Sequence, residues 1–396
     1  MSVIFYLLLL LGIVLVAATL PLLLELLVLS IAALLQRPRT RPERLAKSPM
    51  PITVLIPAHN EEALIGRCVQ SIRSAADRAT KILVIAHNCT DSTALEAKAA
   101  GANVLVLNDP GQVGKGSALS YGFNSLRASN SLAALVIDAD SVIDPGLITA
   151  VRERMQAGAK ALQCRYEVHN SQDSRRTRLM TLAFCGVNVI RPLGRDRLGL
   201  SAGILGNGFA IHRDVLMEIP YNAHSVVEDL EFHLSLVRAG TRVEFIDNAA
   251  VRGEMPVSAK GARAQRARWE GGRIRMMKRW APYLFRNALS GRLRQIEPLL
   301  DLLALPLATE VVLLVISACV PFLWMRIYTM VAFAILFLHI VAIAIKGPGL
   351  SATMKTLVAV PGYILWKLWV FPEIWRNSRL NAEWVRTHRE TTASVH

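Results

Sequence analysis

Residues 3–35 form one long apolar run, VIFYLLLLLGIVLVAATLPLLLELLVLSIAALL, interrupted only by Pro21 and Glu25. The run is longer than the roughly 20 residues that a membrane-spanning helix needs. A cleaved signal peptide is the alternative. No basic segment precedes the run, however, and the apolar core of a signal peptide is only about 7–15 residues long. We therefore expect residues 1–36 to form a retained transmembrane helix.

A second apolar block covers residues 299–346 and is broken near its middle by Arg326. Its length predicts two transmembrane helices joined by a tight turn at the arginine. The composition agrees with several membrane segments, because 53% of the 396 residues are hydrophobic and the mean hydropathy is +0.36. Both values are high for a soluble protein of this size.

Residues 356–375 are also apolar, but they contain two prolines, a glycine and a lysine. We favour a re-entrant or interfacial helix here over a full span, because the basic segment that follows then stays on the cytoplasmic side. Residues 347–396 are accordingly expected to form this helix and a basic cytoplasmic tail.

Basic residues flank the apolar segments. The first run is followed by five of them, Arg37, Arg39, Arg41, Arg44 and Lys47. The positive-inside rule then places the chain from residue 36 onward in the cytoplasm, and we expect a multi-pass membrane protein.

The net charge of +15 could indicate a protein that binds nucleic acid, but the second basic cluster lies just before the second apolar block. It consists of Arg263, Arg266, Arg268, Arg273, Arg275, Lys278, Arg279 and Arg286. Anionic lipid attracts such residues with on the order of 1 kcal/mol each. We therefore expect membrane lipids and no nucleic acid as partners, and we interpret residues 263–298 as interface helices, with 273–288 amphipathic.

Between the membrane segments, residues 37–262 alternate short β-branched runs with stretches of helical character. This alternation predicts an α/β domain with a mostly parallel sheet. Ligands of such sheets bind beyond the carboxyl ends of the strands. Three polar segments follow predicted strands and direct attention to that edge: 57–61 (PAHNE), 87–91 (HNCTD) and 138–140 (DAD).

Asp138 and Asp140 follow the apolar strand ALVI, so both carboxylates emerge at a strand end and can turn to one ion. A solvated acidic turn is the simpler interpretation of an isolated D-x-D. The strand-end position favours a divalent cation that bridges a diphosphate, since Mg²⁺ prefers one or two carboxylates together with phosphate oxygens.

The segment GQVGKGS at 111–117 resembles a phosphate-binding loop. In a true P-loop, Asp109 would be glycine and Gly116 would be serine or threonine. The mismatch excludes a nucleotide-driven transporter and leaves Lys115 as a candidate ligand of another phosphate. We expect Gly114 and Gly116 to let the chain pass close to a nucleotide.

Two further sequence patterns contain candidate catalytic or binding residues. Glu228 and Asp229 open a helical segment, where acidic residues are favoured by the helix dipole alone. Such a pair can also supply a general base whose pKa the neighbouring charge raises. Gln265, Arg268 and Trp269 share one face of a predicted helix. They are either part of a basic helix beside the membrane or a set that binds phosphate and a sugar ring.

The ordered set DAD, VED and QRARW, between membrane segments, resembles the membrane-bound family 2 glycosyltransferases. These include cellulose, chitin and hyaluronan synthases, and the short exopolysaccharide-type enzymes are the most similar. The agreement runs from PITVLIPAHNEE at residue 51 to QRARWEGG at residue 272. The resemblance implies a GT-A (Rossmann-like) fold and an inverting transfer from a nucleotide-diphosphate sugar, with Mg²⁺ or Mn²⁺.

The resemblance also implies roles for individual residues. Asp138 and Asp140 would contact the metal and the diphosphate, and Asp229, with Glu228 beside it, would deprotonate the acceptor. Lys115 would hold the diphosphate from the side opposite the metal. The remaining roles fall into two sets. The nucleoside would contact Ala58, Glu61, His87 and Asp91, whereas the diphosphate and acceptor would contact Gln265, Arg268, Trp269, Asn207 and Gly208.

One departure concerns the donor base. Related chains often have an acidic residue before the C-T-D turn, but this chain has Ala86, His87 and Asn88. UDP is the favoured nucleotide, with His87 as an alternative contact to a base or ribose.

Several products and partners stay open. The favoured acceptor is lipid-linked or a growing saccharide of an exopolysaccharide. A processive synthase that extrudes its product, a ceramide-like glycolipid glucosyltransferase and a non-catalytic scaffold subunit are the alternatives. A homo-oligomer or exopolysaccharide assembly partners are further expectations.

Overall fold

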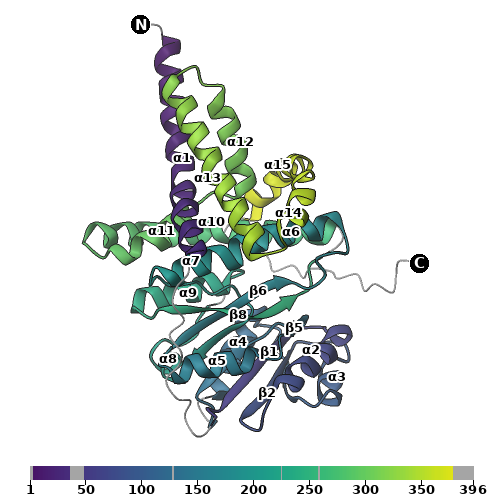
Figure 1. Cartoon of the computed structure of the whole chain (residues 1–396). Helices are drawn as coiled ribbons and strands as arrows, with labels where there is room; N and C mark the ends of the chain where they lie inside the picture. The colour runs from purple at the N-terminus through teal and green to yellow at the C-terminus, as the bar shows by residue number, and fades with distance from the viewer. Residues whose placement is uncertain (1–2, 36–48, 127–128, 224, 257–258, 378–396) are drawn as a thin grey trace. The chain divides into compact units, whose positions relative to one another are not determined.

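The computed structural model describes residues 3–35, 49–126, 129–223, 225–256 and 259–377 (Figure 1). The chain divides into two compact units. Of the described residues, the sheet unit comprises those within 49–184 and 199–265, and the membrane unit comprises those within 3–35, 185–198 and 266–377. This division differs from the expected single block 37–262, because residues 185–198 belong to the membrane unit.

The described part of the sheet unit contains one mixed sheet of eight strands in the order β3-β2-β1-β4-β7-β6-β8-β5. The strands are β1 (Ile52–Ala58), β2 (Thr80–His87), β3 (Asn103–Leu107), β4 (Ala133–Val136), β5 (Ser141–Ile143), β6 (Ala161–Val168), β7 (Phe209–His212) and β8 (Val243–Gly253). The first four are parallel neighbours, as the alternating sequence predicts, and β6 is parallel to β8. β7 runs antiparallel between β4 and β6, and β5 runs antiparallel to β8.

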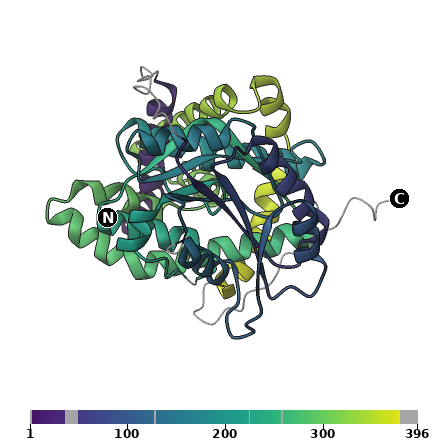
Figure 2. The same ribbon diagram turned by 90° about the horizontal axis from the view of Figure 1, so that it is seen from below.

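Helices cover both faces of this sheet (Figure 2). The helices of this unit are α2 (Glu62–Ala75), α3 (Thr93–Ala99), α4 (Lys115–Leu126), α5 (Leu147–Gln156), α6 (Arg175–Cys185), α8 (Arg213–Glu218) and α9 (Glu228–Ala239). Alternate residues of β1 face opposite sides: Ile52, Val54 and Ile56 join a fully buried core with α2 and α5. Leu55 faces Gly122 of α4 on the other side. The period-2 pattern of the strand thus produces two apolar layers.

The membrane unit consists of helices. They are α1 (Val3–Leu34), a π-helical turn (Gly186–Ile190), α7 (Arg191–Arg197), α10 (Ala259–Leu289, which begins in the sheet unit), a 3-10 turn (Leu293–Gln295), α11 (Ile296–Leu303), α12 (Leu307–Ala318), α13 (Leu323–Lys346), α14 (Leu350–Leu357) and α15 (Val360–Asn377). Helices α1, α12 and α13 pack side by side (Figure 1).

Among the described residues, α1 and α13 are long and apolar enough to cross a membrane. A third span is present if the helical segments 293–303 and 307–318, bent by 81°, together form one. The expected turn at Arg326 is wrong, because this residue lies inside α13 and the break falls at residues 319–322. Pro321 supplies the physical reason, since it has no N–H to continue α12.

A network of buried ion pairs joins helices of the membrane unit that are distant in sequence. The side chain of Glu25, only 1% exposed on α1, accepts hydrogen bonds from Arg191 at 2.6 and 2.9 Å and from Arg195 at 2.7 Å. Asp301 and Glu297 of α11 pair with the same arginines. The residue that interrupts the first apolar run therefore anchors segment 185–198 to α1.

Candidate active site

Two asparagines shape the turns that follow β1 and β2. Asn60 and Asn88 have φ angles of 56° and 52°, in the left-handed region that asparagine tolerates better than most residues. The backbone N–H of Thr90 donates to Oδ1 of Asn60 at 2.7 Å, which ties the two turns together. The turn that contains Ala58 and Glu61 thus lies beside the turn that contains Asp91.

Asp91 has a firmly held carboxylate at this edge. It accepts hydrogen bonds from the backbone N–H of Thr93 at 3.0 Å and of Glu62 at 3.2 Å, and from the Thr93 hydroxyl. Burial alone would raise the pKa of Asp91, but these hydrogen bonds outweigh it and hold the pKa below its usual value. Asp91 is therefore ionised at neutral pH, and Glu61 is fixed beside it by its N–H bond to Thr93 at 2.7 Å.

His87 is buried, with only 4% of its surface exposed. Burial lowers its pKa, so the ring is neutral at pH 7. The next residue, Asn88, donates to the carbonyls of Asp109 at 2.9 Å and Gln112 at 3.0 Å. It also accepts from the N–H of Asp109 at 2.7 Å. Asn88, for which the sequence indicated no role of its own, thus holds the loop that leads to Lys115.

Lys115 is the first residue of α4 and lies among carboxylates. Its ammonium group pairs with Asp138 and donates to the carbonyl of Gly206 at 2.5 Å. Burial alone would lower the pKa of Lys115, but Asp138, Glu228 and Asp229 raise it. The structure therefore places Lys115 directly on Asp138, and the predicted contacts of both residues to a diphosphate stay a prediction.

Buried amide groups fix the turn that carries Asp138 and Asp140. Asn207, fully buried, accepts from the N–H of Asp138 at 3.1 Å and donates to Ser141 Oγ at 2.8 Å. Ser141 in turn donates to Asp140 at 3.0 Å. Gln163 holds this asparagine by donating to its carbonyl at 2.8 Å. Asn207 thus braces the two carboxylates, and the contact to diphosphate or acceptor that the resemblance implies stays a prediction.

Gly206 and Gly208 flank this asparagine with φ angles of 80° and 69°. A Cβ on Gly206 would lie 3.0 Å from Oδ2 of Asp229, and one on Gly208 would lie 2.4 Å from a methyl group of Val251. Gly206 therefore brings its loop against Asp229, whereas Gly208 packs against the sheet.

Glu228 and Asp229 form the second group of carboxylates, at the start of α9. Burial, and next the charge of Asp229, raise the pKa of Glu228 to about 7, although Lys115 opposes the rise. Burial likewise raises the pKa of Asp229, whose Oδ1 accepts from the N–H of Leu230 at 2.8 Å. The two carboxyls titrate as a pair, and near neutral pH the pair can accept a proton.

Gly116 explains why α4 can approach the Glu228 segment. A Cβ at this position would lie 2.3 Å from the carbonyl oxygen of Ala223, which is closer than real Cβ atoms come. The missing side chain thus makes room for protein backbone, not for a nucleotide as the sequence indicated.

We expect Gly116→Ala to destabilise the protein by about 1–3 kcal/mol, because backbone must move to admit the methyl group. Gly66→Ala is the matched control, since Gly66 lies in helix α2 with no atom within 4 Å of the added Cβ. That change should be neutral or stabilising by up to about 1 kcal/mol. Thermal unfolding of the two purified variants checks this, and equal midpoints would show that the contact is unimportant.

Gln265, Arg268 and Trp269 all lie on α10 and are partly buried. The guanidinium carbon of Arg266 lies 6.0 Å from the centre of the Trp269 ring. The helix passes from the sheet unit to the membrane unit within this motif, so its predicted role in binding the diphosphate stays a prediction.

The surroundings of Asp138 and Asp140 bear on whether these residues can bind a metal. Among the described residues, no group of three or more His, Cys, Asp or Glu side chains could hold a metal by itself. Two carboxylates braced at a strand end fit an Mg²⁺ or Mn²⁺ ion that takes its other ligands from phosphate oxygens and water. The donor set therefore fits a metal that arrives with a phosphate ligand.

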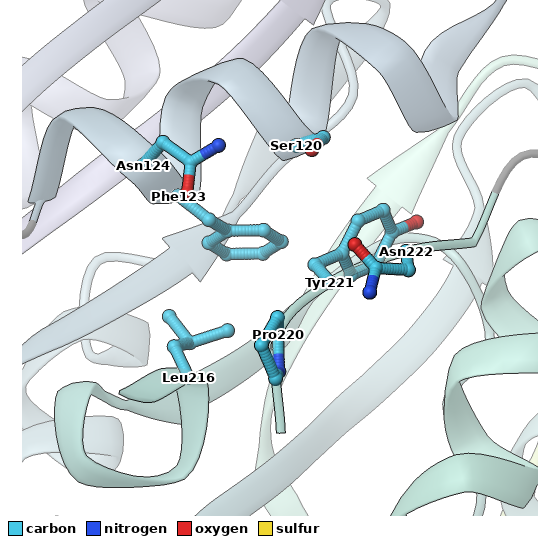
Figure 3. A pocket seen from close by; sticks show the side chains of 7 residues that line it. All are labelled: Ser120, Phe123, Asn124, Leu216, Pro220, Tyr221 and Asn222. Carbon is cyan, nitrogen blue, oxygen red and sulfur yellow. The ribbon is translucent and has the colours of Figure 1, made fainter. Parts of the chain in front are cut away.

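A small pocket lies elsewhere in the sheet unit and contains none of the predicted site residues (Figure 3). It is lined by Ser120, Phe123, Asn124, Leu216, Pro220, Tyr221 and Asn222. The rings of Phe123 and Tyr221 pack with their centres 5.1 Å apart, so much of its wall belongs to the aromatic core. The carboxylates and Lys115, rather than this pocket, make up the candidate site.

Known proteins with related sequences and structures were compared with this chain. The probable glycosyltransferase YdaM of Bacillus subtilis (strain 168) is 27% identical over 235 residues, which are 56% of this chain and 54% of that protein. The chain thus spans about half the length of this curated relative.

Two solved structures illustrate the structural likeness. The mannosyltransferase PcManGT from Pyrobaculum calidifontis, in complex with GDP-Man and Mn²⁺, matches 93% of this chain and 96% of its own, with 17% identity and a TM-score of 0.55. This match confirms the predicted GT-A fold. Glucosyl-3-phosphoglycerate synthase from Mycobacterium tuberculosis matches 56% of this chain and 78% of its own, with 22% identity and a TM-score of 0.39.

A family model described as "Glycosyltransferase like family 2" matches residues 49–272. The matched region contains D-A-D, V-E-D and Q-R-A-R-W in the predicted order. Because the model covers more than half of the chain, this protein belongs to glycosyltransferase family 2.

Proposed function

We propose that this protein transfers a sugar, with inversion, from a nucleotide-diphosphate sugar to an acceptor at the membrane. One observation carries the proposal: Lys115 pairs with Asp138 and lies within the electrostatic influence of Glu228 and Asp229. A single site thus holds a candidate base together with the groups suited to a diphosphate leaving group. An inverting displacement needs both, held in line.

In the proposed step, the acceptor hydroxyl attacks the anomeric carbon and its proton passes to Asp229. The new bond joins the acceptor oxygen to the anomeric carbon, while the bond from that carbon to the diphosphate oxygen breaks. The nucleoside diphosphate leaves with the electron pair of the broken bond. Lys115 stabilises the charge on this leaving group, and Glu228 raises the basicity of Asp229.

Mg²⁺ or Mn²⁺, held by Asp138 and Asp140, would neutralise the diphosphate when bound. The nucleoside would lie along Ala58, Glu61 and Asp91. We keep UDP as the favoured nucleotide and GDP as the alternative. His87 is so deeply buried that we assign it to supporting the neighbouring loop instead of direct base contact.

We propose that the acceptor is located at the membrane. Two helices long and apolar enough to span a membrane support an acceptor that is lipid-linked or a growing saccharide of a cell-surface glycan. We propose that the protein is a multi-pass protein of a bacterial inner membrane, with a cytoplasmic sheet unit. Gln265, Arg268 and Trp269 would hold the diphosphate and the acceptor end, and exopolysaccharide assembly is the proposed setting.

Nucleotide binding by the purified protein tests the proposed site. We expect UDP or GDP to bind in the presence of Mn²⁺, and calorimetry measures the affinity. Lys115→Met should weaken this binding by about 10- to 100-fold, since a hydrogen bond to a charged group contributes about 1.5–3 kcal/mol. Lys160→Met is the control, because Lys160 pairs with Asp214 on the exposed surface. If neither nucleotide binds to the wild type, or if both variants behave alike, the assignment of this site is wrong.

The pH dependence of kcat/KM tests the carboxylate pair. Burial and the charge of Asp229 raise the pKa of Glu228 to about 7, and burial raises the pKa of Asp229, so the coupled pair takes up a proton as the pH falls through this range. The rate should therefore fall about tenfold per pH unit on the acid side of that value, because the base must be ionised. Glu228→Gln removes the like charge, lowers the pKa of Asp229 and should move the acid limb to lower pH. An unmoved limb would exclude this pair as its source.

A further inference from the structure

The C-terminal helix α15 packs against α10 at the Q-R-A-R-W motif. Glu270, the residue after Trp269, has a carboxylate 2.8 Å from the ammonium group of Lys367 on α15. Both side chains are largely buried, with 14% of Glu270 and 10% of Lys367 exposed. The two charges are therefore removed from water together, and each depends on the other for compensation.

Apolar side chains next to this ion pair in sequence also contact one another. Trp366, beside the lysine, packs against Ala267 of α10, which is fully buried, and Ile274 packs against the same residue. Ala267 lies directly before Arg268. Tyr363, one turn earlier on α15, stacks obliquely with Trp366 at a centre distance of 5.6 Å. Two side chains of α15, Lys367 and Trp366, thus contact the turn of α10 that carries the motif.

We propose that Lys367 is a positioning residue: through Glu270 it fixes the turn of α10 from which Arg268 and Trp269 project. The inference rests on the proposed function, in which these two residues hold the diphosphate. It extends the functional part of the chain to α15, about 90 residues beyond the end of the family match at residue 272. A variant of Lys367 then affects the diphosphate more than the nucleoside.

The mechanism follows from the cost of a buried charge. Removing the ammonium group leaves the Glu270 carboxylate buried without its partner, and such a group moves toward water or takes up a proton. Because Glu270 follows Trp269 on the helix, a rotation that exposes its carboxylate also turns Trp269 and Arg268. The proposed contacts of Arg268 and Trp269 to the diphosphate are then lost, while the proposed contacts of the sheet unit to the nucleoside are unaffected.

The experiment compares a nucleoside diphosphate with its monophosphate on purified full-length protein. The probe is whichever of UDP and GDP the wild type binds with Mn²⁺, measured against UMP or GMP. Lys367→Glu and Glu270→Lys should each weaken diphosphate binding at least tenfold and change monophosphate binding less than twofold. The double swap Lys367→Glu with Glu270→Lys should restore diphosphate affinity to within about threefold, and Lys367→Arg should retain it.

Lys355→Glu is the matched control, since Lys355 is an exposed lysine of the neighbouring helix α14. It reverses a charge in the same segment and should change neither affinity. If Lys367→Glu does not fold, Lys367→Met takes its place, with the same expected selective loss. Equal losses of affinity for diphosphate and monophosphate would overturn the inference by showing that Lys367 has a merely structural role. Unchanged diphosphate binding by Lys367→Glu would also overturn it, as would a double-swap variant that folds but does not recover diphosphate affinity. Failure of the wild type to bind either diphosphate would instead contradict the proposed function.

Discussion

Replacing Asp229 with asparagine is expected to lower the rate of sugar transfer by about 10²- to 10⁴-fold, the range that general-base catalysis contributes. The amide keeps the shape of the carboxylate and can still accept from the N–H of Leu230 through its oxygen. It cannot take up the proton of the acceptor hydroxyl. Nucleotide affinity should change little, because the diphosphate is assigned to other side chains. Single-turnover kinetics with a labelled donor separates the two quantities.

Glu228→Gln is the comparison for this substitution. It also removes one carboxylate from the buried pair, but it leaves Asp229 as the base, so transfer should persist with a shifted pH profile. If Glu228→Gln abolished transfer while Asp229→Asn did not, the roles of the two carboxylates would be reversed. If neither variant lost activity, the pair would not supply the base.

Replacing Arg195 with leucine is expected to destabilise the membrane unit by about 3–5 kcal/mol, as breaking a buried ion pair does. Only 8% of the Arg195 side chain is exposed, and it pairs with Glu25, Glu297 and Asp301. Leucine fills part of the space but leaves buried carboxylates without one of their cations. The thermal midpoint of the purified protein in detergent measures the loss.

Lys160→Ala is the control, because it shows how much stability is lost when an exposed ion pair is removed. Its partner Asp214 is 65% exposed, and such surface pairs contribute about 0–1 kcal/mol. A midpoint for Arg195→Leu that matches that of Lys160→Ala would contradict the anchoring role of the buried network.

The sheet could be predicted because its strands carry their own signals. Runs such as ITVLIP and KILVIA are β-branched and apolar, and they become β1 and β2 in parallel register. The strand-end rule then directed attention to Asp91 and Asp138, which follow the ends of β2 and β4 in the structure. Periodicity and strand-end position depend on local sequence, so they were accessible without the fold.

The supporting residues of the site could not be predicted, because their roles depend on contacts distant in sequence. Asn207 lies 69 residues from Asp138, yet its buried amide holds the N–H of that aspartate. Gln163 likewise acts through a carbonyl 44 residues away. Neither residue differs locally from a solvated amide, so only the tertiary structure distinguishes a brace from a ligand contact.

In the membrane unit, too, contacts between residues distant in sequence could not be predicted. Segment 185–198 follows a helix of the sheet unit, and its sequence alone suggests that the arginines are exposed to solvent. In the structure, Arg191 and Arg195 instead donate to the buried carboxylate of Glu25. Similarly, Arg326 is a natural place for a turn in an apolar block, whereas the helix accommodates it close to its own start at Leu323. A charge at the end of a membrane helix can reach the interface, so it does not have to end the helix.

The central claim is most directly tested by incubating the purified full-length protein with labelled UDP-sugars and GDP-sugars, Mn²⁺ and a bacterial lipid extract. The account predicts that at least one donor transfers its sugar to a membrane acceptor in the wild type. It also predicts that Asp229→Asn binds that donor but transfers at most about one hundredth as fast. No transfer from any donor, or equal transfer by Asp229→Asn, would contradict it.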